Sequence, residues 1–269
     1  MKQGQKNMIM EIKETEVREM ESASWGTQFC MVAGRTLKNE FRNPSGVRVK
    51  VFQNIFYAIT TIILFERIAL NENSFIQNLT GALFFLGMNS GFSSIFGALN
   101  VFNAERPIFI RERQSNTYST SAYFFGRTIA FIPQEIILPF IYVVICYFVI
   151  HLNETAGSFF FTYLTLFLMN WMSSAFGIFF STLFEDPEVA MTLIPALMVP
   201  LFLVGGYFAP LVYVPDFYKV FEYLSMYKYG YEGLAYAQFY DGFTTTGTYN
   251  NTQYTYTFTV EQYNQMFQF

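Results

Sequence analysis

Long apolar runs without charged residues constrain the fold of this chain more than any other feature. Four runs hold between 23 and 26 residues each, and Glu135 is the single charge among them. They occupy 79–102, 128–150, 159–184 and 189–214. About 20 apolar residues are enough to cross a bilayer as a helix. A shorter run, 51–65, reaches that length if its helix begins near Val47. The pattern predicts an all-α, polytopic membrane bundle with five spans.

Composition and charge support the same class. Hydrophobic residues make up 52% of the chain and charged residues 13%, whereas a soluble domain carries about 25% charged residues. The N-terminal segment is polar and charged, with no apolar run before a cleavage site, so we expect a cytosolic tail and no cleavable signal. Cys30 lies in a polar region and Cys146 in an apolar run, which argues against an internal disulfide.

The order of apolar, charged and proline-rich segments predicts the division of the chain. Basic residues set the orientation, because 13 of the 16 Lys and Arg residues lie inside if the N-terminus is cytosolic. Pro195, Pro200 and the Gly205-Gly206 pair predict a kinked or broken fifth helix. The expected parts are a cytosolic tail (1–24), an amphipathic helix (25–44), a membrane domain (45–240) and an outer loop (241–269). Within the membrane domain we expect spans near 48–66, 79–102, 124–150, 159–184 and 189–210, a charged loop at 103–120, and a re-entrant stretch at 215–240 that dips into or rests on the outer leaflet.

Two segments flank the first spans on the predicted cytosolic side. In 25–42, apolar residues recur at steps of three and four with basic residues between them, which is typical of an amphipathic helix that ends before Pro44. Such a helix can also simply lie on an anionic leaflet. In 105–113, five charges fall within nine residues, so the stretch must lie in water. Phe109 at its centre is expected to be exposed to a partner, although a loop that only fixes orientation remains an alternative.

The residue patterns of these segments resemble those of a known family. Glu105-Arg106-x-x-Phe109-x-Arg111-Glu112-Arg113, together with 24–29 and 42–44, resembles the G subfamily (White/pleiotropic drug resistance type) of ATP-binding cassette exporters, over about 24–240. The resemblance implies an ABC-2 type transmembrane domain. It further implies a coupling helix that contains Glu105, Arg106, Phe109, Arg111 and Glu112, and a connecting helix that contains Trp25, Gln28 and Phe29.

The chain carries no ATP-binding motif. No Gly-x-x-x-x-Gly-Lys-Ser/Thr stretch is present, so the chain is not expected to be an enzyme by itself. The resemblance implies that ATP and Mg are bound by a nucleotide-binding domain, from the same gene or a separate one. Compared with the family, that domain and a last membrane helix are expected to be missing, through a real truncation or an incomplete gene model.

The implied function is export of lipids, sterols or amphipathic xenobiotics by a homo- or heterodimer of half-transporters in the plasma membrane. The implied partners are the bilayer and a hydrophobic or amphipathic solute, with no nucleic acid. The alternative is a truncated, non-transporting paralogue that dimerises with full-length transporters and modulates them.

A solute cavity is the site that the apolar runs suggest. Phe85, Met88, Asn89 and Phe92 follow steps of three and four and share one helical face, which suits flat amphipathic solutes but also ordinary helix packing. The resemblance places this face in a central cavity between two protomers. It also implies further cavity residues and an outer gate: Pro195, Val199 and Phe202, with Tyr207 and Phe208.

Three polar positions complete the predictions. Glu135, inside a span, is expected to face protein or water and either belongs to a solute or proton path or pairs with a group such as Asn170. Asn153 and Asn250 begin Asn-x-Thr sequons on the predicted outer side, so both are glycosylation candidates. Neither catalytic residues nor metal ligands are predicted.

Overall fold

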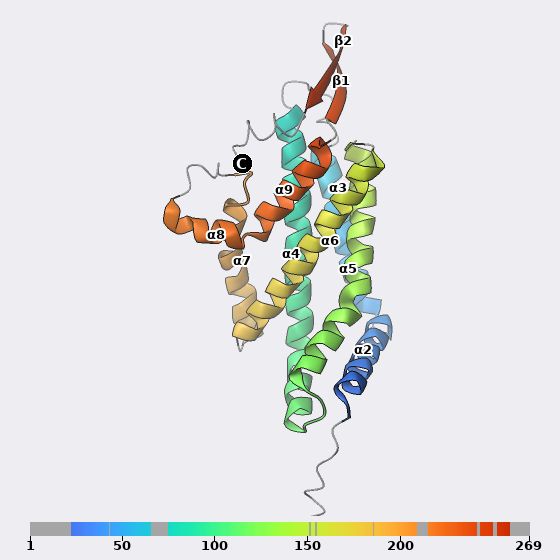
Figure 1. The fold of residues 1–269 in the computed structure, drawn as a ribbon, viewed down its shortest axis with the longest axis vertical. Coiled ribbons are helices and arrows are strands. Elements are labelled where there is room, and N and C mark those ends of the chain that lie inside the picture. Colours follow the sequence, from blue (N-terminus) through green and yellow to red (C-terminus); the bar gives the residue numbers. More distant parts are fainter. Residues whose placement is uncertain are drawn as a thin grey trace, which may run out of the picture. The chain divides into compact units, whose positions relative to one another are not determined.

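The computed structural model describes residues 23–42, 44–65, 75–150, 152–153, 155–184, 186–208, 215–240, 243–249 and 252–258. Most of the predicted tail and the sequon at Asn250 lie outside these residues. The described elements are α2 (Trp25–Arg42), α3 (Pro44–Phe65), α4 (Phe75–Gln114), α5 (Thr120–Ile150), α6 (Ala156–Leu183), α7 (Pro187–Leu203), η4 (Asp216–Tyr218), α8 (Lys219–Leu224), α9 (Met226–Phe239), β1 (Phe243–Tyr249) and β2 (Thr252–Phe258) (Figure 1).

The chain divides into two compact units. Unit 1 contains Met1–Pro44 and Glu105–Ile132, and unit 2 contains Ser45–Ala104 and Pro133–Phe269. Unit 1 therefore consists of α2, the C-terminal end of α4 and the N-terminal end of α5, and the remaining elements belong to unit 2.

The helical, polytopic class predicted from the apolar runs is confirmed. Among the described residues, four helices are long and apolar enough to cross a membrane: Val47–Phe65, Asn78–Gln114, Thr120–Ile150 and Ala156–Leu183. The predicted fifth span is not among them, because α7 stops at Leu203 after 17 residues, so the expected count of five spans is wrong by one within the described residues. Pro195 and Pro200 lie inside α7, and the chain then turns at Gly206, whose φ of 87° is available to glycine at little cost.

The segment 103–120, predicted as a charged loop that contains a coupling helix, is helical as far as Gln114. α4 continues from the apolar run through Glu105 to Gln114, with Pro107 inside it, and only 115–119 form the turn to α5. Pro107 removes one backbone donor, yet the helix continues, and Arg111, Glu112, Arg113 and Gln114 near its end are good helix formers. Asn116, at a φ of 52°, reverses the chain after the helix ends.

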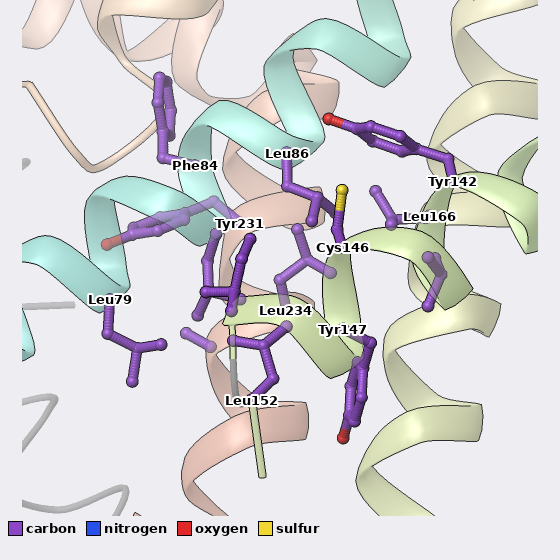
Figure 2. Packing of buried hydrophobic residues seen from close by; sticks show 14 of the residues in the cluster. Leu79, Phe84, Leu86, Tyr142, Cys146, Tyr147, Leu152, Leu166, Tyr231 and Leu234 are labelled. Carbon is purple, nitrogen blue, oxygen red and sulfur yellow. The ribbon is translucent and has the colours of Figure 1, made fainter. Parts of the chain in front are cut away.

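Unit 2 has a core that α4, α5, α6 and α9 build together. Figure 2 shows Leu86 of α4, Cys146 of α5 and Leu234 of α9 directed toward the same interior, and all three are at most 1% exposed. α9, within the predicted re-entrant stretch, packs along α6, and its Leu234 also approaches Gly87 of α4. Glycines allow this approach, since a Cβ on Gly233 would lie 2.8 Å from Cγ2 of Thr165.

Part of the predicted outer loop is a hairpin. β1 and β2 pair antiparallel, from Phe243 opposite Phe258 to Tyr249 opposite Thr252. The Thr and Tyr residues that made this segment look like an irregular polar loop also favour strands, because β-branched and aromatic side chains suit a pleated ribbon.

Candidate functional site

Glu112 is the centre of a polar network in unit 1. The two terminal nitrogens of Arg35 on α2 donate to its two carboxylate oxygens over 2.6 and 3.0 Å. The hydroxyl of Tyr118, which follows α4, donates to the same carboxylate over 2.7 Å. A bidentate arginine bond fixes direction as well as distance. The network therefore ties α2 to the charged end of α4.

The protonation states of this network are stable at neutral pH. The hydrogen bond to Glu112 raises the pKa of Arg35 above its usual value, despite the opposing effect of burial. Burial, reinforced by the bond to Glu112, raises the pKa of Tyr118 to about 12. Tyr118 therefore keeps its proton and remains a donor to Glu112.

A second polar network lies about two helical turns earlier on α4, at Glu105. Glu105 accepts hydrogen bonds from Arg127 Nε over 2.6 Å and from the Tyr123 hydroxyl over 3.1 Å. Phe109 packs against Tyr118 and Tyr123, with ring centroids 6.4 and 4.6 Å away. Phe109 was expected to be exposed to a partner, but it is partly buried in this stack. The exposed apolar side chains beside it are Ile108 and Ile110.

The N-terminal half of α2 is fastened to the start of α5. Gln28 accepts a bond of 2.8 Å from the backbone nitrogen of Ser119, and Trp25 Nε1 donates to Ser121 over 3.1 Å. Trp25 also stacks on Phe29 at 5.4 Å. The three residues predicted for the connecting helix are thus in contact with the α4–α5 connection or with one another.

Unit 1 contains an open cavity of about 360 Å³. Lys38 and Arg42 are exposed on its α2 side, and Ile108 and Phe109 supply apolar surface from α4. Arg111 is also exposed, whereas Arg106 is partly buried. The full lining is Arg35, Thr36, Lys38, Asn39, Arg42, Glu105, Ile108, Phe109, Tyr118 and Tyr123. A cavity with this lining suits an acidic surface that also carries apolar side chains.

Unit 2 contains an aromatic cluster built around Phe84. Its ring centroid lies 5.1 Å from Phe202 and from Tyr207, and 5.3 Å from Phe208. The structure therefore brings both predicted gate residues together with Phe202. Phe84, which the sequence reasoning passed over, is their common neighbour. Phe85 instead lies 5.9 Å from Phe65 of α3.

The remaining predicted cavity residues point to different surroundings. Phe92 lies 6.3 Å from Phe202, and Met88 packs against the core of unit 2. Asn89 is 9% exposed, and its Nδ2 has no hydrogen-bond partner among the described residues. Pro195 and Val199 are exposed on α7. The set is thus split between a packed interior and an open helix face.

Glu135 lines a small polar cavity in unit 2. It accepts a hydrogen bond of 3.0 Å from Ser174, while Asn170, the partner named from the sequence, accepts a bond from Ser90 over 2.7 Å. The partner helix was predicted correctly and the residue was wrong by one turn. The cavity has room of about 30 Å³, and Lys50 also lines it. That volume suits one or two water molecules.

Asn153 makes hydrogen bonds to Gln238 within unit 2. Its side-chain nitrogen donates to the backbone oxygen of Gln238 over 3.1 Å, and its backbone nitrogen donates to Gln238 Oε1 over 2.9 Å. Gln238, which is fully buried, also donates to Thr162 over 2.8 Å. Tyr147 donates to the backbone oxygen of Asn153. No sequence motif identified Gln238, because a single glutamine in an aromatic stretch carries no pattern.

Comparisons with known proteins agree on one family. A family model described as "ABC-2 type transporter" matches residues 27–239. "Protein white" of Ceratitis capitata is 31% identical over 229 residues, 85% of this chain and 34% of that protein. "ABC transporter ATP-binding protein/permease wht-1" of Caenorhabditis elegans is 33% identical over 214 residues, 80% of this chain and 32% of that protein.

A mammalian relative is similar at a slightly lower identity. "Broad substrate specificity ATP-binding cassette transporter ABCG2" of Sus scrofa is 28% identical over 221 residues, 80% of this chain and 33% of that protein. The chain spans about a third of the length of these relatives.

Proposed function

The chain belongs to the ABC-2 type transporter family, and on that premise we propose that it is the translocating membrane part of an ATP-driven exporter. Its solutes are lipids, sterols or amphipathic xenobiotics. ATP and Mg are held by a nucleotide-binding domain of the same or a separate polypeptide. The names of two relatives support this, because one is an ATP-binding protein and permease and another has broad substrate specificity.

The observation that carries the proposal is the fastening of α2 to the charged end of α4. Arg35 and Tyr118 converge on Glu112 with three hydrogen bonds of 2.6 to 3.0 Å. Because a bidentate ion pair resists rotation as well as separation, α2 and this end of α4 move together. The apolar segment 79–102 and the charged end both belong to α4. A displacement of the charged end is therefore transmitted along a single helix.

The nucleotide-binding domain docks at the cavity of unit 1. Lys38 and Arg42 give the cavity a basic rim, while Ile108 offers an apolar contact at 54% exposure. An acidic helix of the partner domain with a few apolar side chains complements both features. ATP binding then shifts the membrane helices between inward-open and outward-open states by its different affinity for the two.

The aromatic cluster of unit 2 receives the solute. Phe92 and Phe202 are partly buried and offer ring faces on which flat apolar molecules stack, while buried Phe84 supports Phe202. Tyr207 and Phe208 close the path toward the outside. The exposed apolar face of α7, which includes Leu197 and Val199, meets the second protomer of a homo- or heterodimer. The N-terminus is cytosolic, and the plasma membrane is the site of action.

Solute-stimulated ATP turnover of the complete transporter tests this function. Glu112→Ala and Arg111→Ala abolish the stimulation by solute while surface expression stays normal, because coupling is lost without loss of fold. Lys219→Ala serves as the matched control, because it breaks an exposed ion pair with Asp216 in unit 2. Unchanged stimulation in Glu112→Ala contradicts the coupling role.

A further inference from the structure

Tyr227 on α9 is a buried tyrosine with an unused hydroxyl. The residue is 1% exposed, and its oxygen has no hydrogen-bond partner among the described residues. Buried tyrosine hydroxyls usually find a partner, because a phenol that loses water without replacement is costly. Two glycines make room for the ring: a Cβ on Gly91 would lie 3.0 Å from Cε1 of Tyr227, and one on Gly205 would lie 3.3 Å from its Cβ.

The ring of Tyr227 adjoins two residues of the predicted solute cavity. Its centroid lies 5.8 Å from Phe92 and 5.9 Å from Phe202, and those two rings lie 6.3 Å from each other. Phe92 and Phe202 are partly buried, whereas Tyr227 is enclosed. Rotamers of partly exposed side chains change within nanoseconds. Movement of these two phenyl rings is the step that would bring a solute next to Tyr227.

We propose that Tyr227 determines solute specificity by donating a hydrogen bond to an acceptor atom of a flat aromatic solute that enters between Phe92 and Phe202. The inference rests on the proposed function and adds the chemistry of the solute: an aromatic ring system that carries a carbonyl or a ring nitrogen. A hydrocarbon of the same shape leaves the hydroxyl unpaired and is disfavoured, since sites built for a hydrogen bond reject analogues that lack one.

The electrostatic surroundings keep this hydroxyl a neutral donor. Burial raises the pKa of Tyr227 above its usual value. The hydrophobic cluster that contains Tyr227 includes the thioethers of Met169 and Met226. The neighbouring hydroxyl of Ser173 already donates to the backbone oxygen of Met169 over 2.7 Å. The donor of Tyr227 is thus available to an incoming acceptor.

A matched pair of solutes tests the proposal directly. Fluorenone and fluorene are flat tricycles of nearly the same shape that differ by one carbonyl oxygen. Their dissociation constants are measured by thermal-shift titration of the full chain in lipid nanodiscs. The proteins are the wild type, Tyr227→Phe, and the control Tyr163→Phe, whose hydroxyl donates to the backbone of Ile136 over 3.1 Å away from the aromatic cluster.

The wild type and Tyr163→Phe are expected to prefer fluorenone by about five- to tenfold, the range of one neutral hydrogen bond. In Tyr227→Phe the preference falls to about one, through weaker fluorenone binding alone. Melting of the unliganded variant near the wild-type temperature confirms that the fold is intact. A preference retained in Tyr227→Phe, or absent from the wild type, overturns the inference. If the wild type binds neither solute, the aromatic solute site of the proposed function fails as well.

Discussion

Arg35 and Glu112, which lie 77 positions apart in the sequence, face each other with two parallel hydrogen bonds of 2.6 and 3.0 Å. Arg35 is 51% exposed in this pair and Glu112 25%. The pair is therefore partly screened by solvent. It contributes more to the orientation of α2 on the charged end of α4 than to the free energy of folding. It joins the helix that precedes the first span to the charged end of α4.

Arg35→Lys tests the importance of that direction. Lysine keeps the charge but cannot make two parallel bonds, so the free energy of unfolding is expected to fall by about 1 kcal/mol. Solute-stimulated ATP turnover of the complete transporter falls more than this small loss of stability explains. Thermal melting in detergent and turnover in nanodiscs are measured on the same sample. Turnover equal to that of Lys219→Ala would speak against a directional role.

Gly177→Ala tests the close approach of α6 to α4. A Cβ at Gly177 collides with the backbone oxygen of Ile95 and lies 3.1 Å from Cβ of Ala98, and a backbone atom cannot move aside cheaply. The expected loss is about 2 kcal/mol. Gly157→Ala on the same helix has nothing within 4 Å and is expected to gain up to about 1 kcal/mol from better helix propensity. Equal melting of the two variants would contradict the packing described above.

Asn153→Gln separates a structural role from a glycan acceptor. The side chain of Asn153 and its backbone nitrogen are both bonded to Gln238, so the longer amide is expected to lower the unfolding free energy by about 1–2 kcal/mol. Gln238→Leu lowers the unfolding free energy further, because it also removes the hydrogen bond from Gln238 to Thr162. Glycosidase treatment is expected to leave the mobility of wild type and Asn153→Gln equal. A shift that only the wild type shows would assign Asn153 as an acceptor.

Glu135 and Lys50 are expected to behave as one unit. Both line the same small polar cavity, so each charge is expected to be affected by removal of the other. The double variant of Glu135→Leu with Lys50→Met is expected to be more stable than the sum of the single changes by about 1–2 kcal/mol. A double-mutant cycle of melting temperatures measures this term. Additive losses would show that the two charges are independent.

The sequence predicted the membrane helices well because charge-free apolar runs leave few alternatives. α5 and α6 begin within four residues of the predicted spans and end within one. The start and end of α7 were harder. A 26-residue apolar run resembles a full span, but Gly205-Gly206 ends the helix at Leu203. The apolar pattern cannot distinguish a helix that stops inside the run from one that merely bends.

The site was predicted less completely, because its partners come from distant parts of the chain. The charged stretch identified Glu105 and Glu112, but nothing local indicated that Tyr118 and Tyr123 would donate to them. Helical spacing grouped Phe85 with Phe92, yet the tertiary neighbours select Phe84. Phe109 looked exposed because its sequence neighbours are charged, and two tyrosines from the following segment partly cover it.

Labelling from one side of the membrane tests the central claim most directly, since coupling requires the charged end of α4 to lie on the cytosolic side. In a Cys30→Ser background, an impermeant maleimide is applied to cells that carry Gln114→Cys, at the exposed end of α4, or Tyr223→Cys, on α8. The account predicts that Tyr223→Cys is labelled in intact cells and Gln114→Cys only after permeabilisation. Labelling of Gln114→Cys in intact cells would contradict it.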